Sequence, residues 1–296
     1  MEVAIVVNAN QQWDIVTSVG LTALGVAAAR AVETGRDGAL VRDRFAEPFV
    51  RAANPPHPMP TSPQDPASAD GHWAWMADFL AVRSRYFDEY FAEAGRSGVR
   101  QLVLLAAGLD SRSFRLDWPA GSRVFEVDQP KVLEFKDRVL AEQGAQPASE
   151  RRIVDTDLRE DWTSALTAAG FDPSVPTAWL VEGLTPYLPA AAEQQLFAEI
   201  DRLSAPGSRV GVEWVHDVAA MLEEPAFRPS AELLGVDLAE LWSTEPRVPA
   251  DERLRGLGWA MRSETLAEAG ARYGRAFDSA EGRLIGEHGR LGIAER

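Results

Sequence analysis

Cysteine is absent from the 296-residue sequence, and histidine is scarce. The lack of cysteine excludes disulfides, thiolate nucleophiles and thiolate metal sites. The histidines are scattered and form neither an HxxxH nor an HExxH pattern: His57, His72, His216 and His288. We therefore expect no metal site.

The sequence also lacks an excess of positive charge and any long apolar segment. Its net charge of −15 would repel a phosphate backbone, so we expect no nucleic-acid partner. No run of roughly eighteen uncharged apolar residues is present, and the start, MEVAIVVNANQQW, has no basic region before a long apolar core. These absences favour a cytoplasmic protein without a membrane partner.

A GxGxxG motif is missing too, although the segment 101–129 has other features of a nucleotide-binding unit. The apolar run 102–106 predicts a central parallel strand covered on both faces. A second strand, 123–127, leads to Asp128, where an acid can accept hydrogen bonds from a ribose, and Gly108 lets a ligand approach the backbone. The pattern indicates nucleoside binding, although a purely structural α/β turn would look the same.

The residues after Gly108 argue against a phosphorylated nucleoside. The turn continues Leu109-Asp110-Ser111-Arg112, which places an acid where a diphosphate would lie. S-adenosylmethionine (SAM) combines an adenosine diol with a zwitterionic amino acid and a sulfonium cation, so an acidic pocket suits it. The alternative, an NAD-dependent oxidoreductase, shares the acid at the strand end but is disfavoured by the missing glycine motif.

Helical patterns precede this segment. Residues 14–34 and 40–53 predict two helices, and the Pro- and Ser-rich stretch 54–70 is typical of a loop. A third predicted helix, 71–94, carries more aromatic residues than one narrow core stripe needs. These aromatic residues belong either to the core or to the wall of an acceptor pocket.

Strands and helices alternate from 101 to 213, which predicts an α/β fold with a doubly wound, mostly parallel sheet. The further elements expected are strands 152–156, 176–181 and 208–213 and helices 129–142, 159–169 and 190–203. Polar or small residues follow the carboxyl ends of four strands, at the edge where open α/β sheets bind ligands. They are Gly108, Asp128, Asp157 and Glu182.

The rest of the chain is expected to complete the same domain. The stretch 214–249 has aromatic and aliphatic residues without a strand pattern, which favours a helical cap. Segments 255–262 and 282–288 are candidates for the last strands, as an antiparallel pair. We expect one domain, 1–296, made of a helical lid (14–98), a binding core (99–213), a helical cap insertion (214–253) and the C-terminal part of the core (254–296).

Five motifs occur along the chain: RSRYFDEYF (83–91), LLAAGLDSRSFRL (104–116), FEVDQPKVLEFK (125–136), DTDL (155–158) and EGLTPYL (182–188). In order and spacing they resemble the SAM-dependent methyltransferases of the leucine carboxyl methyltransferase type, which include an actinobacterial branch of natural-product enzymes. The resemblance covers about residues 20–275. It implies a class I, Rossmann-like methyltransferase fold and SAM as the cofactor.

The resemblance also implies roles for individual residues. Arg83 matches the arginine that pairs with the SAM carboxylate, for which a guanidinium fork is suited. Gly108 matches the glycine whose backbone passes the amino-acid moiety, and Asp128 the acid on the ribose hydroxyls. Asp157 and Leu158 match the pair at the adenine. Asp157 would also suit a helix N-cap, and Arg83 a solvated helix face.

Glu182 matches the acid near the methionine ammonium. Two positions depart from the family pattern. Ala106 stands where many members have the first glycine of a GAG turn, and Arg30 is the nearest match to a basic ligand near the N-terminus.

The methyl acceptor leaves weaker signals in the sequence. Methyl transfer from a sulfonium needs alignment and exclusion of water, and no covalent protein intermediate. If the acceptor requires a general base, His216 is the candidate, and Tyr187 could orient an acceptor hydroxyl; each also suits a structural role. Nine tryptophans favour a small apolar or aromatic acceptor, methylated at oxygen, nitrogen or carbon, carboxylates included. Protein carboxyl methylation and a SAM-binding module without turnover are the alternatives, and we expect a monomer or homodimer.

Overall fold

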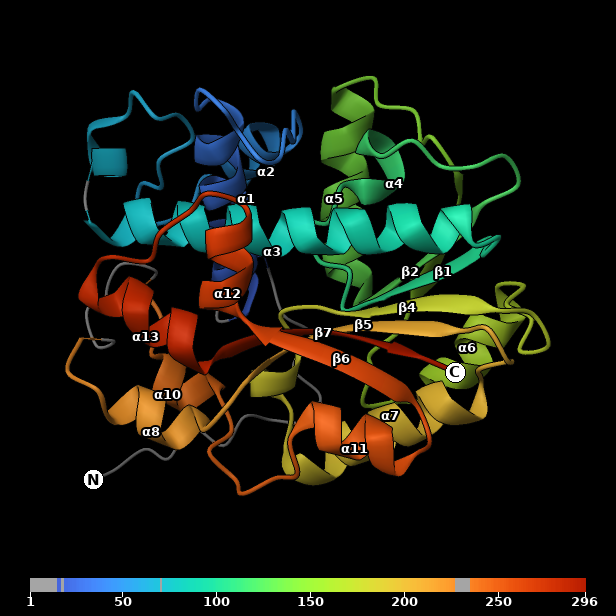
Figure 1. The fold of residues 1–296 in the computed structure, drawn as a ribbon. Helices are drawn as coiled ribbons and strands as arrows, with labels where there is room; N and C mark the ends of the chain where they lie inside the picture. Colours follow the sequence, from blue (N-terminus) through green and yellow to red (C-terminus); the bar gives the residue numbers. More distant parts are fainter. Residues whose placement is uncertain (1–14, 17–18, 70, 227–234) are drawn as a thin grey trace, which may run out of the picture.

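Seven strands form one sheet in the computed structural model, which describes residues 15–16, 19–69, 71–226 and 235–296. The strands are β1 (Gln101–Leu105), β2 (Arg123–Asp128), β3 (Glu150–Asp155), β4 (Thr177–Val181), β5 (Arg209–Val215), β6 (Ala260–Thr265) and β7 (Gly289–Glu295). Their order across the sheet is β3-β2-β1-β4-β5-β7-β6 (Figure 1). β1 to β5 are parallel, and β7 pairs antiparallel with both β5 and β6.

Helices cover both faces of the sheet. They are α1 (Val19–Thr34), α2 (Ala46–Ala53), α3 (Gly71–Arg96), α4 (Arg112–Arg115), α5 (Pro130–Glu142), α6 (Trp162–Ala168), α7 (Ala190–Arg202), α8 (Val218–Glu223), α10 (Leu238–Leu241), α11 (Ala250–Gly256), α12 (Leu266–Arg272) and α13 (Ala280–His288). Two 3-10 turns, η1 (Pro66–Ala69) and η2 (Thr185–Tyr187), complete them. α3, α4 and α5 lie on one face, and α6, α7 and α11 on the other (Figure 1).

The central strands read as unbroken apolar runs because both of their faces are covered. Every residue of β1 is buried. Leu102 and Leu104 pack into the core under α3 and α5, whereas Val103 and Leu105 pack into the core on the α6 and α7 side. Alternate side chains of one strand therefore stabilise two separate cores.

The aromatic residues of α3 belong mostly to the core, because this helix contacts the sheet, α1, α12 and α13 and is therefore buried on several sides. Trp73, Phe87 and Phe91 are almost fully buried. The hydroxyl of Tyr90 donates to the Trp179 carbonyl at 2.9 Å, which ties α3 to β4. The first turns of the same helix also reach a cavity, as described below.

The predicted alternation from 101 to 213 is confirmed, with small shifts at helix starts. The second helix begins at Ala46 and not at residue 40. The helix expected at 159–169 begins at Trp162, because Asp161 is its N-cap and accepts from the Ser164 amide at 3.1 Å. In the predicted helix 14–34, residues 14, 17 and 18 lie outside the described residues.

The antiparallel pairing of the last two strands is confirmed, but their positions differ from the prediction. The predicted strand 255–262 overlaps β6 only at residues 260–262, because α11 extends to Gly256. Residues 282–288 belong to α13, which begins after Ser279, whose hydroxyl caps the Gly282 amide at 2.9 Å. The strand follows α13 as β7, and it was not predicted there because Gly292 interrupts the run of apolar residues. A side chain at Gly292 would collide with Met261 and Trp214, so close packing requires glycine there.

The predicted cap contains the short helices α8 and α10, and residues 227–234 of it lie outside the described residues. Within the described ranges, no helix combines the length and the apolar character of a membrane span.

Candidate active site

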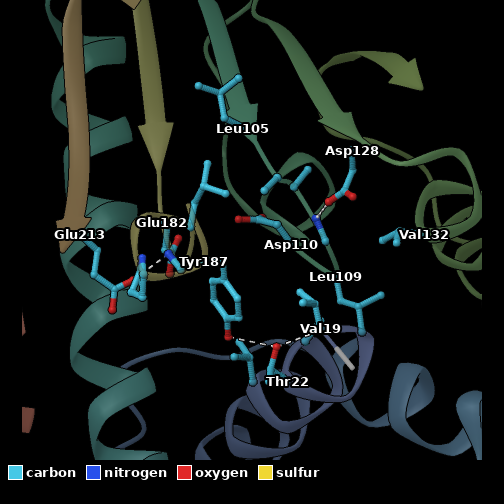
Figure 2. Close-up of a pocket in the computed structure, with 18 of the residues that line it drawn as sticks. Val19, Thr22, Leu105, Leu109, Asp110, Asp128, Val132, Glu182, Tyr187 and Glu213 are labelled. Atoms are coloured by element: carbon cyan, nitrogen blue, oxygen red, sulfur yellow. Dashed lines mark hydrogen bonds between the residues drawn. The ribbon is translucent and has the colours of Figure 1, made fainter. Parts of the chain in front are cut away.

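A cavity of about 710 Å³ lies at the carboxyl ends of the parallel strands. Figure 2 shows the walls that come from α1 and from the ends of β1, β2, β4 and β5. Residues of α3 and of the cap complete the lining. All of the predicted cofactor residues and one of the two candidate catalytic residues line it: Arg83, Gly108, Asp128, Asp157, Leu158, Glu182 and Tyr187. Strand-end residues far apart in the sequence are thus brought to one space.

Asp128 and Gly108 form a hydrogen-bonded pair between the ends of β2 and β1. The Gly108 amide donates to Asp128 Oδ2 at 2.6 Å, and the Gln129 amide donates to Oδ1 at 2.7 Å (Figure 2). Burial raises the pKa of the Asp128 carboxyl above its ordinary value, against these two hydrogen bonds. Each carboxylate oxygen keeps a lone pair that can accept from a hydroxyl group.

The turn before Gly108 is tight in spite of the alanine at its start. Ala106 has φ +53° and Gly108 has φ +45°, both in the left-handed region. This conformation costs an L-residue roughly 1–2 kcal/mol. Hydrogen bonds from the Ala107 amide to the Val127 carbonyl at 3.0 Å and from the Asp110 amide to the Ala107 carbonyl at 2.8 Å hold the turn.

Asp157 lies beyond the end of β3 and does not cap α6. Its Oδ1 accepts from the Arg159 amide at 2.9 Å, and its Oδ2 accepts from Gln129 Nε2 at 3.0 Å. Burial opposes ionisation, but the hydrogen bonds and charge of Arg159 prevail and lower the pKa of Asp157. Leu158 beside it contributes an apolar side chain to the cavity wall.

Arg83 is a buried charge and not a solvated one, since only 7% of the residue is exposed. Its Nε forms an ion pair with Glu182 Oε1 at 2.9 Å, and its Nη1 forms another with Glu213 Oε2 at 3.0 Å. Two carboxylates from the ends of β4 and β5 therefore converge on one guanidinium that projects from α3.

Arg112 is a second buried arginine, with 3% of the residue exposed. Its Nη1 contacts Glu182 Oε2 at 2.7 Å and also Asp110, and its Nε contacts Asp88 Oδ1 at 2.8 Å. Burial would raise the pKa of Asp110, but the charges of Arg112, Lys136 and Arg115 lower it to about 2. Arg112 was not predicted as a site residue, because α4 is a single turn and its partners are scattered along the chain.

Glu213 was also not predicted as a site residue, although its position at the end of the fifth predicted strand was a usable signal. It lines the cavity, and its Oε2 accepts from the Gly183 amide at 2.7 Å (Figure 2). Burial raises the pKa of the Glu213 carboxyl, against the charge of Arg83.

The side chains that α1, the first turns of α3 and the cap bring to the cavity are mostly apolar, and we call the part that they line the apolar end. Its lining includes Val19, Val26, Trp75, Met76, Phe79, Leu184, Val215, Leu238 and Leu241. Tyr187 stands at the border, where its hydroxyl donates to Thr22 Oγ1 at 3.2 Å and its ring meets Trp242 edge-on at 6.2 Å (Figure 2). Burial raises the pKa of the Tyr187 hydroxyl. This tyrosine is neutral at physiological pH and can orient a group but not act as a ready base.

The cap is attached to the turn that follows β4. The Ser243 amide donates to the Pro186 carbonyl at 2.7 Å. Arg247 Nη1 donates to the Thr185 carbonyl at 3.0 Å and to Glu193 Oε2 at 2.8 Å. The wall of the apolar end is therefore fixed to the same turn that carries Glu182.

His216 is not among the residues that line the cavity. Its side chain is exposed, and its amide donates to the His288 carbonyl at 2.8 Å. The structure thus does not bring this candidate base to the predicted cofactor residues. Among the described residues, no group of three or more histidine or acidic side chains is arranged to hold a metal ion.

Comparisons with known proteins agree with this geometry. The family model of leucine carboxyl methyltransferases matches residues 23–201. A protein of Saccharopolyspora erythraea assigned to the SAM-dependent methyltransferases is 48% identical over 98% of this chain and 99% of that protein. A protein of Rhodococcus jostii with the same assignment is 50% identical over 92% of this chain and 93% of that protein.

A crystal structure shares the fold. It is that of a protein from Thermobifida fusca described as a methyltransferase, with a TM-score of 0.54 at 17% identity, covering 92% of this chain and 94% of that chain. The family match and the full-length relatives settle the class of enzyme. The chain belongs to the leucine carboxyl methyltransferase family and is a SAM-dependent methyltransferase with a class I α/β fold.

Proposed function

We propose that this enzyme methylates a small apolar or aromatic metabolite, with SAM at the charged end of the cavity and the acceptor at the apolar end. The observation that carries the proposal is that one cavity is lined both by carboxylates from strand ends and by aliphatic and aromatic side chains from the helices. Its volume of about 710 Å³ is within the range of small-molecule sites.

The residues at the charged end fit the cofactor. Gly108 leaves the wall beside Asp128 without a side chain, which gives the cofactor access to the backbone. In the part of the chain that the structure describes, six carboxylates and five guanidinium groups line the cavity, namely those of Asp110, Asp128, Asp157, Glu182, Glu213 and Glu240 with those of Arg30, Arg83, Arg112, Arg115 and Arg159. The excess of negative charge favours a ligand with ammonium and sulfonium groups.

We assign the binding contacts as follows. Asp128 accepts from the ribose hydroxyls, Asp157 and Leu158 hold the adenine, Glu182 meets the ammonium, and Arg83 meets the carboxylate. When bound, SAM supplies a methyl group on a positive sulfur, which a nucleophile displaces in line. The protein has to align the acceptor and exclude water.

We propose that the lid (14–98) and the cap (214–253) perform these two tasks at the apolar end. Tyr187, held by Thr22, orients the acceptor at the border between the two ends. Tyr187 is neutral and His216 lies outside the cavity lining, so neither residue serves as a general base. We therefore propose an acceptor atom that is nucleophilic without help from a histidine. The mostly apolar lining that the helices and the cap provide suits a small metabolite better than a protein side chain.

The test uses SAM labelled in its methyl group and a panel of phenols, amines, aromatic acids and aliphatic acids, together with unfolded and folded proteins. Label in small organic products supports the proposal. Label only in protein would overturn it in favour of protein carboxyl methylation. Calorimetric SAM binding without transfer to any acceptor would favour a module without turnover.

A further inference from the structure

We infer that Glu213 is a positioning residue for the cofactor, because it holds the Arg83 guanidinium in the orientation that receives the cofactor carboxylate. The inference rests on the proposed role of Arg83. It adds a residue at the end of β5 to a set of cofactor contacts that otherwise comes from α3 and the ends of β1 to β4.

The contacts of Arg83 fix the plane of its guanidinium. Nη1 donates to Glu213 Oε1 at 3.2 Å and to Oε2 at 3.0 Å, whereas Nε lies 2.9 Å from Glu182 Oε1 as an ion pair without a hydrogen bond. Glu213 therefore supplies the directional contacts that orient the planar guanidinium. Nη2 has no hydrogen-bond partner within residues 15–16, 19–69, 71–226 and 235–296. The edge that carries Nη2 is therefore available to a ligand carboxylate.

Glu213 is itself held by the backbone of the turn after β4. The Gly183 amide donates to its Oε2 at 2.7 Å, and Gly183 has φ +63°. A Cβ added at Gly183 would stand 3.7 Å from Arg83 Nη1, which shows how closely the turn approaches the guanidinium. One carboxylate thus fixes both the arginine and the turn that carries Glu182.

The chain contains a matched pair for comparison. Glu193 is 2% exposed and binds Arg247 Nη1 through Oε2 at 2.8 Å, so it is also a buried glutamate paired with an arginine. It is not among the cavity-lining residues. Glu193→Gln removes the charge of this ion pair, while Arg247 keeps its hydrogen bonds to the Thr185 and Ser243 carbonyls, so the segment that carries Glu182 stays anchored.

The experiment measures, by calorimetry, the ratio of affinities for SAM and for its decarboxylated analogue. We expect Arg83→Gln to lower this ratio, and Glu213→Ala and Glu213→Asp to lower it by about tenfold, since the guanidinium loses the carboxylate that accepts its hydrogen bonds. Glu213→Gln should stay within about threefold, because its amide oxygen can accept from both Gly183 and Arg83. Glu193→Gln should lower the melting temperature and leave the ratio unchanged.

The possible outcomes distinguish a failure of the role inferred for Glu213 from a failure of the role proposed for Arg83. An unchanged ratio in Arg83→Gln would overturn the role of Arg83 and the inference with it. A lowered ratio in Arg83→Gln with no change in any Glu213 variant would overturn the inference alone. A ratio retained by Asp and lost by Gln would show that Glu213 acts through its charge and not by positioning. If Glu213→Ala does not fold, the Asp and Gln variants decide.

Discussion

The charged end of the cavity and its apolar end are built from different parts of the chain. Strand ends in one parallel sheet make the charged end, and their side chains are held in a network of buried ion pairs. Helices of the N-terminal region and of the cap bring mostly apolar side chains to the cavity, although Arg30 and Glu240 also line it. The difference suggests that cofactor binding and acceptor choice can be changed separately, and five predictions test that separation.

The largest effect is expected on protein stability, when an arginine with three carboxylate partners is removed. Arg112→Met should lower the free energy of unfolding by about 3–5 kcal/mol, because three partly buried carboxylates each lose one arginine partner. Urea unfolding measures it. Arg85→Met, which removes an exposed arginine on α3, should cost at most about 0.5 kcal/mol. Equal losses in the two variants would contradict a structural role for the network.

Asp128→Ala should weaken SAM binding by about 1.5–3 kcal/mol, because it removes a charged acceptor from the ribose site. Calorimetric titration with SAM measures the change. Asp155→Ala is the control, since this exposed residue ends the neighbouring strand β3 outside the cavity lining. Similar affinities for the two variants would show that the ribose contact is misassigned.

The affinity for SAM should also fall on acidification. Burial raises the pKa of Asp128, so its carboxylate becomes protonated at a pH above the ordinary 3.8 and then loses charge as an acceptor. The loss should approach about tenfold per pH unit once the group is protonated. In Asp128→Asn this part of the pH dependence should vanish. A wild-type profile that is flat down to pH 3.8 would contradict the raised pKa.

A change at the apolar end should act on the acceptor alone. Leu241→Ala should raise KM for the acceptor found in the panel by roughly fivefold, or about 1 kcal/mol, through lost apolar contact. Its affinity for SAM should not change. Leu222→Ala, in the same cap but outside the cavity lining, is the control. A large loss of SAM affinity in Leu241→Ala would break the separation of the two ends.

The smallest effect is expected at the turn before Gly108. Ala106→Gly relieves the left-handed strain but adds flexibility to the unfolded chain, so its stability should change by less than about 1 kcal/mol. Ala107→Gly, where φ is not positive, should lose about 0.5–1 kcal/mol. Thermal unfolding of both variants compares them. A loss at Ala106 that exceeds the loss at Ala107 would argue against strain in the turn.

The sequence predicted the charged end well because one rule governs it. Buried parallel strands appear as apolar runs, and their carboxyl ends meet at one edge, so Gly108, Asp128, Asp157 and Glu182 could be grouped without coordinates. The same rule applied to the fifth strand would have found Glu213. It could not find Arg112, because nothing local shows that Asp88 on a preceding helix lies beside it.

The apolar end was less predictable. Helices α1, α3 and α10 meet there only through tertiary packing, and apolar positions in a helix look alike whether they face a core or a cavity. The two candidate catalytic residues show this limit: Tyr187 lines the cavity, and the His216 side chain is exposed outside the cavity lining, while its backbone is hydrogen-bonded to His288. Their roles stay predictions.

The attachment of the cap to the turn after β4 bears on redesign of this enzyme. Exchanging the cap with that of a relative would be the direct way to change the acceptor, yet Ser243 and Arg247 anchor it to the backbone at Pro186 and Thr185. A chimera joined upstream of Ser243 keeps these anchors. A chimera that replaces Ser243 and Arg247 would disturb the segment that carries Glu182. Such an enzyme would lose affinity for SAM as well as for its original acceptor.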